Sequence, residues 1–399
     1  MSTIRHPGAG ETGAAGHIPY ADLALLWVAS RLALLIVGLV STSLLSSGLL
    51  VQKGNLVYHE PAPLPLEIWA RWDSEWYLLI ADKGYGAGDP VQALPPRYTP
   101  SATAGFLPLY PLLIRALSPT MGSVASGVFI SNLFLAGALL LLYRLTTLEV
   151  PGDAGHQAGL AACAALLVFP TTLFLSAVYS ESLFLFLALL TFERARRGRF
   201  AAAAAAGALA AVTRPFGLLL VLPVLAEWWI QRRTDPSTPR WAWVAAAGIP
   251  AGFGLFMILC ARVFSDPLAF FHRQEHWRGR MSGPWHAFVR WWDQTPAVHG
   301  AHDSTLEMVT AALFIALLPI MVRRLRPSYT LYAAAGILLP LCTTVWSFGR
   351  FALTIFPAFM LVGIGWVGRQ RRLVIVYAVI AATLSGFFMA LFANWWWVS

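Results

Sequence analysis

Two acidic side chains, Asp73 and Glu75, lie two residues apart in a short segment that is rich in aromatic residues. Asp73 can cap a helix that begins at Ser74, and Gly84 fits just past the end of that helix. Residues two apart point to nearly opposite faces of a helix, so we expect only one of the two acids to face a given site. Asp73 is therefore either a plain helix cap or a functional acid held at the edge of an apolar region.

A further acid, Glu181, follows a row of hydroxyl side chains. Thr172, Ser176 and Ser180 are four residues apart, which predicts one polar face on a helix that starts after Pro170. Glu181 then lies about 15 Å along this helix. An ionisable side chain at such a depth is a candidate functional group, and the alternative is a protonated acid that hydrogen-bonds between helices.

Two arginines, Arg214 and Arg350, lie at the ends of apolar runs and away from the arginine-dense loops. A guanidinium group there can hold a phosphate through two parallel hydrogen bonds, or it can simply extend to the nearest polar surface. The histidines between residues 265 and 305 do not have the spacing of a metal site. The three cysteines lie in separate apolar runs without a metal-binding pattern, so we expect no metal.

The composition indicates what kind of protein positions these groups. The chain has 399 residues, of which 58% are hydrophobic and 12% are charged, and its mean hydropathy is +0.64. A soluble protein carries about 25% charged residues and cannot bury this much apolar surface in its core. A soluble enzyme, a fibrous protein and a disordered chain are excluded, and a polytopic membrane protein remains. No motif accompanies the net charge of +9, so we expect no nucleic-acid partner.

The apolar runs predict an all-α fold with about eleven transmembrane helices. Most of the runs are close to the ~20 residues that a bilayer requires. Short runs are paired around Pro170 and around Pro215, so we expect both turns to face a cavity. The runs cover residues 21–45, 124–143, 157–169, 172–192, 200–213, 215–230, 241–264, 306–322, 329–346, 351–367 and 373–393.

The arginines indicate how the chain crosses the membrane. With the N-terminus in the cytoplasm, every arginine-dense loop falls on the cytoplasmic side, as the positive-inside rule requires. These loops are 193–199, 231–240, 323–327 and 369–372. We expect residues 1–20 to be a flexible cytoplasmic tail and residues 21–399 to form one transmembrane domain. Loops 46–123 and 265–305 then lie outside, the first with helices in the membrane interface.

Several of these segments together resemble the PIG-V type of mannosyltransferase, which belongs to the GT-C class of membrane glycosyltransferases. The resemblance covers roughly residues 25–230, and Phe216 departs from it because a polar residue is expected before the glycine. The motifs that carry it are Arg71-Trp72-Asp73, Tyr77, Ile80-Ala81, Gly84-Tyr85, Phe106, Pro108-Leu109-Tyr110-Pro111, Phe169-Pro170, Tyr179-Ser180-Glu181-Ser182-Leu183-Phe184, Thr213-Arg214-Pro215 and Gly217.

The resemblance implies a GT-C-like fold and transfer of a mannosyl or related residue. The implied donor is a polyprenyl- or dolichyl-phosphate sugar, and the acceptor is a glycolipid, a glycan or a protein on the extracytoplasmic face. Because a phosphate leaving group needs no protonation, one carboxylate suffices, and we assign Asp73 as the base of an inverting displacement. No cofactor is needed beyond the lipid-phosphate sugar, which is a substrate. The residues to which we assign substrate binding are Arg71, Trp72, Glu75, Tyr110, Tyr179, Glu181, Arg214 and Arg350.

A multi-pass transporter or lipid flippase is the alternative function. An acid within a span and short paired spans are features of transporters, whereas the sequence shows no internal repeat. The chain is rich in alanine and arginine and poor in lysine, which favours a GC-rich bacterial genome and the bacterial plasma membrane over the endoplasmic reticulum. The identity of the acceptor, the oligomeric state and any partner subunit are not predicted from the sequence.

Overall fold

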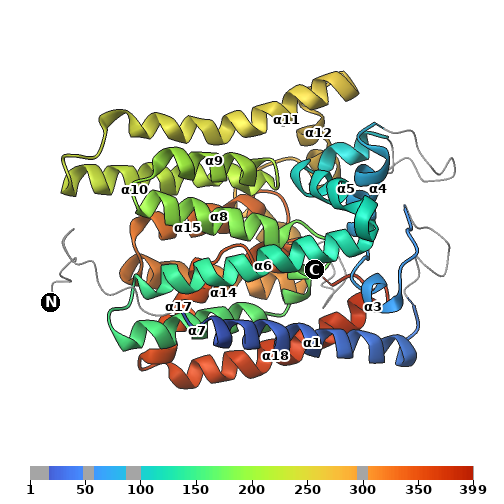
Figure 1. Cartoon of the computed structure of the whole chain (residues 1–399), viewed down its shortest axis with the longest axis horizontal. Helices are drawn as coiled ribbons and strands as arrows, with labels where there is room; N and C mark the ends of the chain where they lie inside the picture. Colours follow the sequence, from blue (N-terminus) through green and yellow to red (C-terminus); the bar gives the residue numbers. More distant parts are fainter. Residues whose placement is uncertain (1–17, 48–57, 87–99, 294–303, 399) are drawn as a thin grey trace.

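The protein is a bundle of helices that lie side by side along its longest axis (Figure 1). The computed structural model describes residues 18–47, 58–86, 100–293 and 304–398, and within these ranges it contains helices and no strand. Each predicted apolar run contains one of the main helices, which confirms the all-α class. These helices are α1 (Tyr20–Leu44), α6 (Ser123–Thr147), α7 (Asp153–Val168), α8 (Glu181–Arg196), α9 (Phe200–Ala211), α10 (Val221–Thr234), α11 (Gly248–Phe264), α14 (Thr305–Arg324), α15 (Pro327–Leu341), α17 (Pro357–Val367) and α18 (Arg371–Ala393).

Five helical segments of the described chain are long and apolar enough to cross a bilayer. They are Tyr20–Leu44, Ser123–Thr147, Arg240–Phe264, Thr305–Arg324 and Arg371–Ala393, the third of which joins the 3₁₀ helix η5 (Arg240–Ala247) to α11. The protein is therefore an integral membrane protein. The other helices are shorter, so the count of eleven spans stays a prediction.

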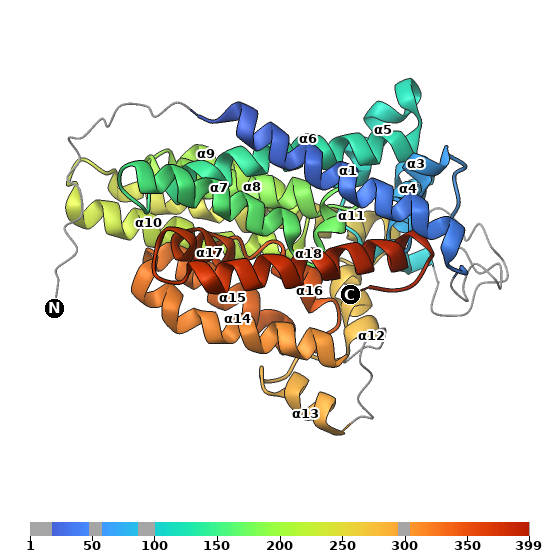
Figure 2. The same ribbon diagram turned by 90° about the horizontal axis from the view of Figure 1, so that it is seen from below.

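Short helices from the two long loops gather at one end of the bundle (Figure 1). As predicted, α4 begins at Ser74, and it ends where Gly84 takes a φ of +83°. The side chain of Asp73 makes no capping hydrogen bond, so the plain-cap interpretation of this acid is wrong. These short helices are α3 (Leu64–Glu67), α4 (Ser74–Lys83), η2 (Pro100–Gly105), α5 (Leu109–Met121) and α12 (Ala269–Arg278). A further short helix, α13 (His286–Asp293), lies off the side of the bundle (Figure 2).

The arginine-dense loops come together at another place in the bundle. Arg196 pairs with Glu149, which joins the end of α8 to the turn between α6 and α7. Arg326 pairs with Glu227 of α10 at 3.0 Å, and the Gln231 amide donates to the carbonyl oxygen of residue 195 at 2.7 Å. Three of the four arginine-dense loops are thereby held together, as expected of loops on the same side of a membrane.

The helices before and after Pro170, and those before and after Pro215, are separated by breaks in helical structure. The break after Pro170 changes the predicted position of Glu181. After Pro170 the chain forms only the 3₁₀ helix η3 (Thr172–Leu175), and α8 does not begin until Glu181. The prediction that Glu181 lies some ten residues along a helix is therefore wrong, because it is the first residue of α8. At the second break Arg214 is extended, with φ −148° and ψ 147°, since the residue before a proline avoids the helical region.

The backbone of residues 176–180 lies outside any helix, so its polar groups need other partners inside an apolar bundle. Ser131 Oγ lies 2.8 Å from the carbonyl oxygen of Ala177. The buried guanidinium of Arg31 donates to the carbonyl oxygen of Thr172 at 3.0 Å and to its hydroxyl at 3.0 Å. Side chains from α1 and α6 therefore hold the turn that delivers Glu181.

We expect Gly363→Ala to lower the stability of the protein. A Cβ atom at this position of α17 would lie 2.2 Å from the carbonyl oxygen of Ala158 in α7, so the two helices would have to separate. Overpacking of this kind costs about 1–3 kcal/mol. Gly254→Ala in α11 is the control, because its Cβ meets nothing within 4 Å and alanine favours a helix. The apparent Tm in detergent should fall for Gly363→Ala alone, and an equal fall in both variants would contradict the packing argument.

Candidate active site

Four charged side chains from distant parts of the sequence form an alternating network. Arg350 Nη1 donates to Asp73 Oδ2 at 2.6 Å, and Arg350 Nε lies 3.1 Å from Glu181 Oε1. Arg214 Nη1 donates to the same Glu181 oxygen. These residues come from the start of α4, the start of α8, the turn before η4 (Pro215–Leu220) and α16 (Phe348–Ala352). The structure thus brings together the predicted base and three of the predicted substrate-binding residues.

Burial within the network falls from one end to the other. The Glu181 side chain is fully buried, Arg214 is 8% exposed, Arg350 is 13% exposed and Asp73 is 27% exposed. Two carboxylates and two guanidinium groups balance in charge, which is the condition under which such groups are tolerated in an apolar interior. Asp73 is the most open member, so a reacting group can approach the network from its side.

Tyr179 fixes the backbone from which Asp73 projects. Its hydroxyl donates to the carbonyl oxygen of Arg71 at 3.1 Å and accepts from the Asp73 N–H at 3.1 Å. Between them Trp72 has a φ of +60°, a conformation that is rare for a residue with a side chain. The Arg350 guanidinium carbon also lies 5.4 Å from the centre of the Tyr179 ring. Tyr179 therefore both shapes the Asp73 turn and borders the ion pair.

Tyr77 joins α4 to the same region, although it was predicted only as part of a motif. Its hydroxyl lies 2.9 Å from Ser180 Oγ, the residue just before Glu181. Burial raises the pKa of Tyr77 to about 12, and the negative charge of Glu181 acts in the same direction. Tyr77 is thus a neutral hydrogen-bonding group at neutral pH.

Two other predicted substrate-binding residues, Arg71 and Trp72, contact other parts of the protein. Arg71 pairs with Glu67 at 2.9 Å and lies 4.8 Å from the centre of the Trp395 ring, and burial lowers the pKa of its guanidinium. Trp72 packs edge-on against Trp397, with ring centres 5.2 Å apart. These contacts tie the Arg71–Trp72 segment to the C-terminal end of the chain rather than to the charge network.

Tyr110 and Glu75 are likewise buried in the protein. The Tyr110 hydroxyl donates to the carbonyl oxygen of Gly127 at 3.0 Å and lies 2.8 Å from Ser131 Oγ. Glu75 is 6% exposed, and its charge acts on Arg71. The helix that begins at Ser74 therefore does separate Asp73 from Glu75, as predicted from their spacing.

The residues that position Arg350 were not identified from the sequence. Glu307 Oε2 accepts from the N–H of Gly349 at 2.5 Å, and Thr171 Oγ1 donates to the Gly349 carbonyl oxygen at 2.8 Å. Glu307 follows Ser304 by three residues, a pattern that predicts a helix-capping box. Ser304 does accept from the Glu307 N–H at 3.3 Å, but the Glu307 carboxylate turns to Gly349 instead. Nothing local to the sequence signals this long-range contact.

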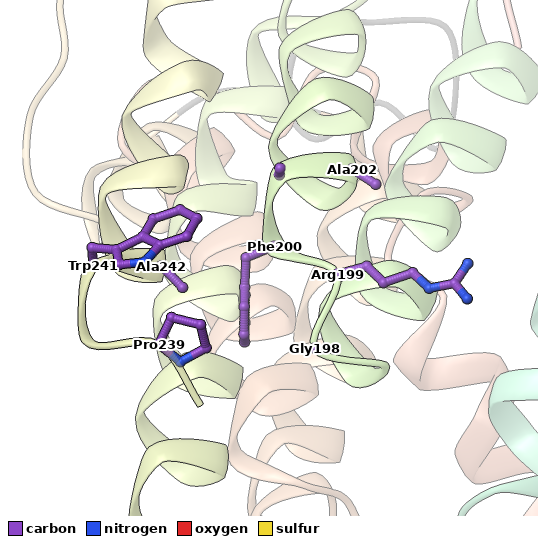
Figure 3. A pocket seen from close by; sticks show the side chains of 8 residues that line it. Gly198, Arg199, Phe200, Ala202, Pro239, Trp241 and Ala242 are labelled. Atoms are coloured by element: carbon purple, nitrogen blue, oxygen red, sulfur yellow. The ribbon is translucent and has the colours of Figure 1, made fainter. Parts of the chain in front are cut away.

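We also searched the described residues for metal ligands and for hollows outside the charge network. No three His, Cys, Asp or Glu side chains of this part of the protein come together as metal ligands, and the expectation of a metal-free site stays a prediction. A shallow hollow lies between the start of α9 and the start of η5, with Arg199, Phe200 and Trp241 on its walls (Figure 3). It contains none of the residues of the charge network and lies among the arginine-dense loops.

Comparison with known proteins finds a family match and two curated relatives. Residues 31–227 match the family described as Mannosyltransferase (PIG-V). The chain is 34% identical over 161 residues to GPI alpha-1,6-mannosyltransferase 2 of Mus musculus, covering 38% of this chain and 29% of that protein. The Rattus norvegicus protein of the same name is 36% identical over 156 residues, covering 38% and 30%. The match therefore spans less than a third of the length of these curated relatives.

Two solved structures are similar over most of the chain. One is ArnT from Cupriavidus metallidurans bound to undecaprenyl phosphate, with 14% identity, a TM-score of 0.48 and coverage of 93% of this chain and 76% of that one. The other is the Archaeoglobus fulgidus oligosaccharyltransferase in the apo form, with 12% identity, a TM-score of 0.48 and coverage of 96% and 57%. The predicted PIG-V resemblance is confirmed by the family match, which includes Asp73, Tyr179, Glu181 and Arg214 and ends before Arg350.

We expect Glu181→Gln to destabilise the protein. The change removes the carboxylate that lies between Arg214 and Arg350 and leaves two buried guanidinium groups without their common partner. Breaking a buried ion pair from one side costs about 3–5 kcal/mol. Glu275→Gln, which removes an exposed carboxylate paired with Arg280, is the control and should cost less than about 1 kcal/mol. Equal apparent Tm values for the two variants in detergent would show that the network does not stabilise the fold.

Proposed function

We propose that the protein, whose residues 31–227 match the PIG-V mannosyltransferase family, is a membrane glycosyltransferase that uses Asp73 as its only catalytic base. The observation that supports this most strongly is the position of Asp73. It is the most exposed member of a buried charge network, and its partner Arg350 is a group suited to bind phosphate. A carboxylate and a phosphate-binding cation are thereby held in contact at one end of the bundle.

The proposed reaction is a single displacement at the anomeric carbon. The donor is a polyprenyl- or dolichyl-phosphate sugar, mannose by the family match, and the acceptor is a hydroxyl of a glycolipid, a glycan or a protein. As the hydroxyl oxygen attacks, its proton passes to Asp73, while the bond between the sugar and the phosphate breaks. The phosphate leaves with its electron pair and needs no proton. One displacement inverts the configuration of the anomeric carbon.

Arg350 changes partners in the proposed reaction. Before the donor binds, its Nη1 donates to Asp73 Oδ2 and holds the base in an ion pair. A lipid phosphate that approaches from the exposed Asp73 side offers oxygens that compete for the same guanidinium, and charge-assisted hydrogen bonds to phosphate are strong. Binding of the donor therefore releases the base, and Arg350 then stabilises the charge that develops on the leaving phosphate.

Arg214 and Glu181 would support this exchange. Glu181 contacts both guanidinium groups. It therefore holds Arg350 beside Asp73 and holds Arg214 on the side of Arg350 that is buried. Its second carboxylate oxygen has no hydrogen-bond partner within the described residues. The transporter alternative rested on Glu181 within a span and on the short paired spans. Of these two features, Glu181 instead begins α8 beside the partner of Asp73.

The protein works at the extracytoplasmic face of a membrane in this proposal. The charge network lies with α4 at the end of the bundle where the two long loops gather, whereas the arginine-dense loops pair with one another elsewhere. The lysine-poor composition supports a bacterial plasma membrane.

We expect Asp73→Asn to lower turnover by roughly 10²–10⁴-fold, because a positioned general base contributes that much. The measurement is transfer of radiolabelled mannose from polyprenyl-phosphate mannose to membrane lipid extracts by the purified protein. Glu75→Gln is the matched control two residues away, and its effect should be milder. If Glu75→Gln abolishes turnover while Asp73→Asn retains most of it, the base is wrongly assigned.

We expect Arg214→Lys to raise the KM for the donor. Lysine keeps the positive charge but lacks the planar guanidinium group, whose several N–H donors can bind a carboxylate and a phosphate together. Arg280→Lys, at a side chain that is 91% exposed and outside the network, serves as the control and should leave KM unchanged. Unchanged kinetics in both Arg214→Lys and Arg214→Ala would remove Arg214 from the site.

A further inference from the structure

The short helix α13 has two apolar faces, only one of which is used inside the protein. On its inner face Ala287 is fully buried, and Phe288 and Trp291 pack against the core. On its outer face Trp285, Val289 and Trp292 are 69%, 49% and 80% exposed. Their spacing of four and three residues places them on one side of a helix. Large apolar side chains exposed together indicate a surface that is covered by something else.

The outer face of α13 continues an apolar surface of the bundle. Figure 2 shows α13 off the side of the bundle, beyond α14, rather than beyond the bundle's end. Along α14 itself Val309 and Leu313 are 49% and 61% exposed, and α14 is apolar and long enough to cross a bilayer. Membrane lipid is what covers the exposed face of such a helix. The exposed side chains of α13 therefore lie beside a surface that already faces lipid.

We propose that α13 lies in the interface of the outer leaflet, with Trp285, Val289 and Trp292 inserted at the boundary between headgroups and acyl chains. Tryptophan is enriched at this depth because its large ring is apolar and its N–H is polar. A helix whose inner face is fixed to the protein and whose outer face is apolar fits a lipid surface lying parallel to it. This proposal rests on the membrane location alone and not on the proposed glycosyl transfer.

The segment before α13 is hydrogen-bonded to residues 342–346, which lead into the helix that carries Arg350. The Ser282 N–H donates to the carbonyl oxygen of Cys342 at 2.7 Å. Arg278 donates to Thr343 Oγ1 at 3.2 Å and to the carbonyl oxygens of residues 344 and 346 at 3.1 and 2.9 Å. The segment that leads into α13 is thereby fastened to the turn that carries Arg350. The depth at which α13 lies in the leaflet sets the height of that turn above the acyl chains.

Spin labels on α13 test the proposal in vesicles of phosphatidylcholine and phosphatidylglycerol. The background is Cys342→Ser, or Cys342→Ala if the serine variant does not fold, since Cys163 and Cys260 are buried. Labels at Val289→Cys and Trp292→Cys should collide more with oxygen, which dissolves in lipid, than with a water-soluble nickel chelate. A label at Arg280→Cys, in the exposed loop before α13, should show the reverse preference.

Two outcomes would overturn the proposal. If labels 289 and 292 prefer the nickel chelate as label 280 does, the outer face lies in water. If they collide with neither reagent, a protein surface covers the face, either a second copy or another partner. As a further check, Val289→Asp should shift label 292 toward the nickel chelate, and Val289→Asn should shift it less. No shift in either variant would also count against insertion.

Discussion

The pairing of Arg350 with two carboxylates is the interaction on which the arrangement of the bundle depends. Glu181 is fully buried, and an isolated charge in such a place is strongly unfavourable. It is tolerated because Arg214 and Arg350 both reach the same oxygen. For this to happen, four segments of the chain must end at one place. The interrupted helices at residues 170, 214 and 347 are therefore required by the charges and are not irregularities of packing.

The network also explains why the turns around it are held so firmly. The backbone outside the helices needs polar partners in an apolar bundle, and side chains supply them. The Tyr179 hydroxyl hydrogen-bonds to the backbone on both sides of Trp72. Glu307 and Thr171 hydrogen-bond to the N–H and the carbonyl oxygen of Gly349. Asp73, Glu181 and Arg350 are thus carried by turns whose backbone groups hydrogen-bond to distant residues. Such support holds the charged side chains in a fixed arrangement, as the proposed displacement at one carbon atom would require.

Much of the fold and part of the site could be predicted from local features of the sequence. The apolar runs set the helices, and the start of α4 at Ser74 followed from a capping residue and a glycine. Asp73, Glu181, Arg214 and Arg350 stood out because charge is rare in apolar surroundings. The depth of Glu181 was mispredicted because the four-residue spacing before it suggested a helix, whereas Pro170 and the hydrogen bonds from Arg31 and Ser131 hold that stretch as a turn. The role of Glu307 depends on a contact 42 residues away and that of Arg71 on a contact 322 residues away, which local spacing does not encode.

The origin of Arg350 in the last part of the chain has a consequence for biosynthesis. Asp73, Glu181 and Arg214 are made within the first 214 residues, and Arg350 follows 136 residues after Arg214. A membrane protein is inserted from its N-terminus onward. During that interval the nascent bundle carries two carboxylates, Asp73 and Glu181, and one guanidinium group, Arg214, at the future site of the network. The net negative charge of these three groups must keep water or lipid headgroups around it. The arrival of α16 neutralises this charge and expels the solvent, so the last helices to be inserted close the assembly that the first ones began.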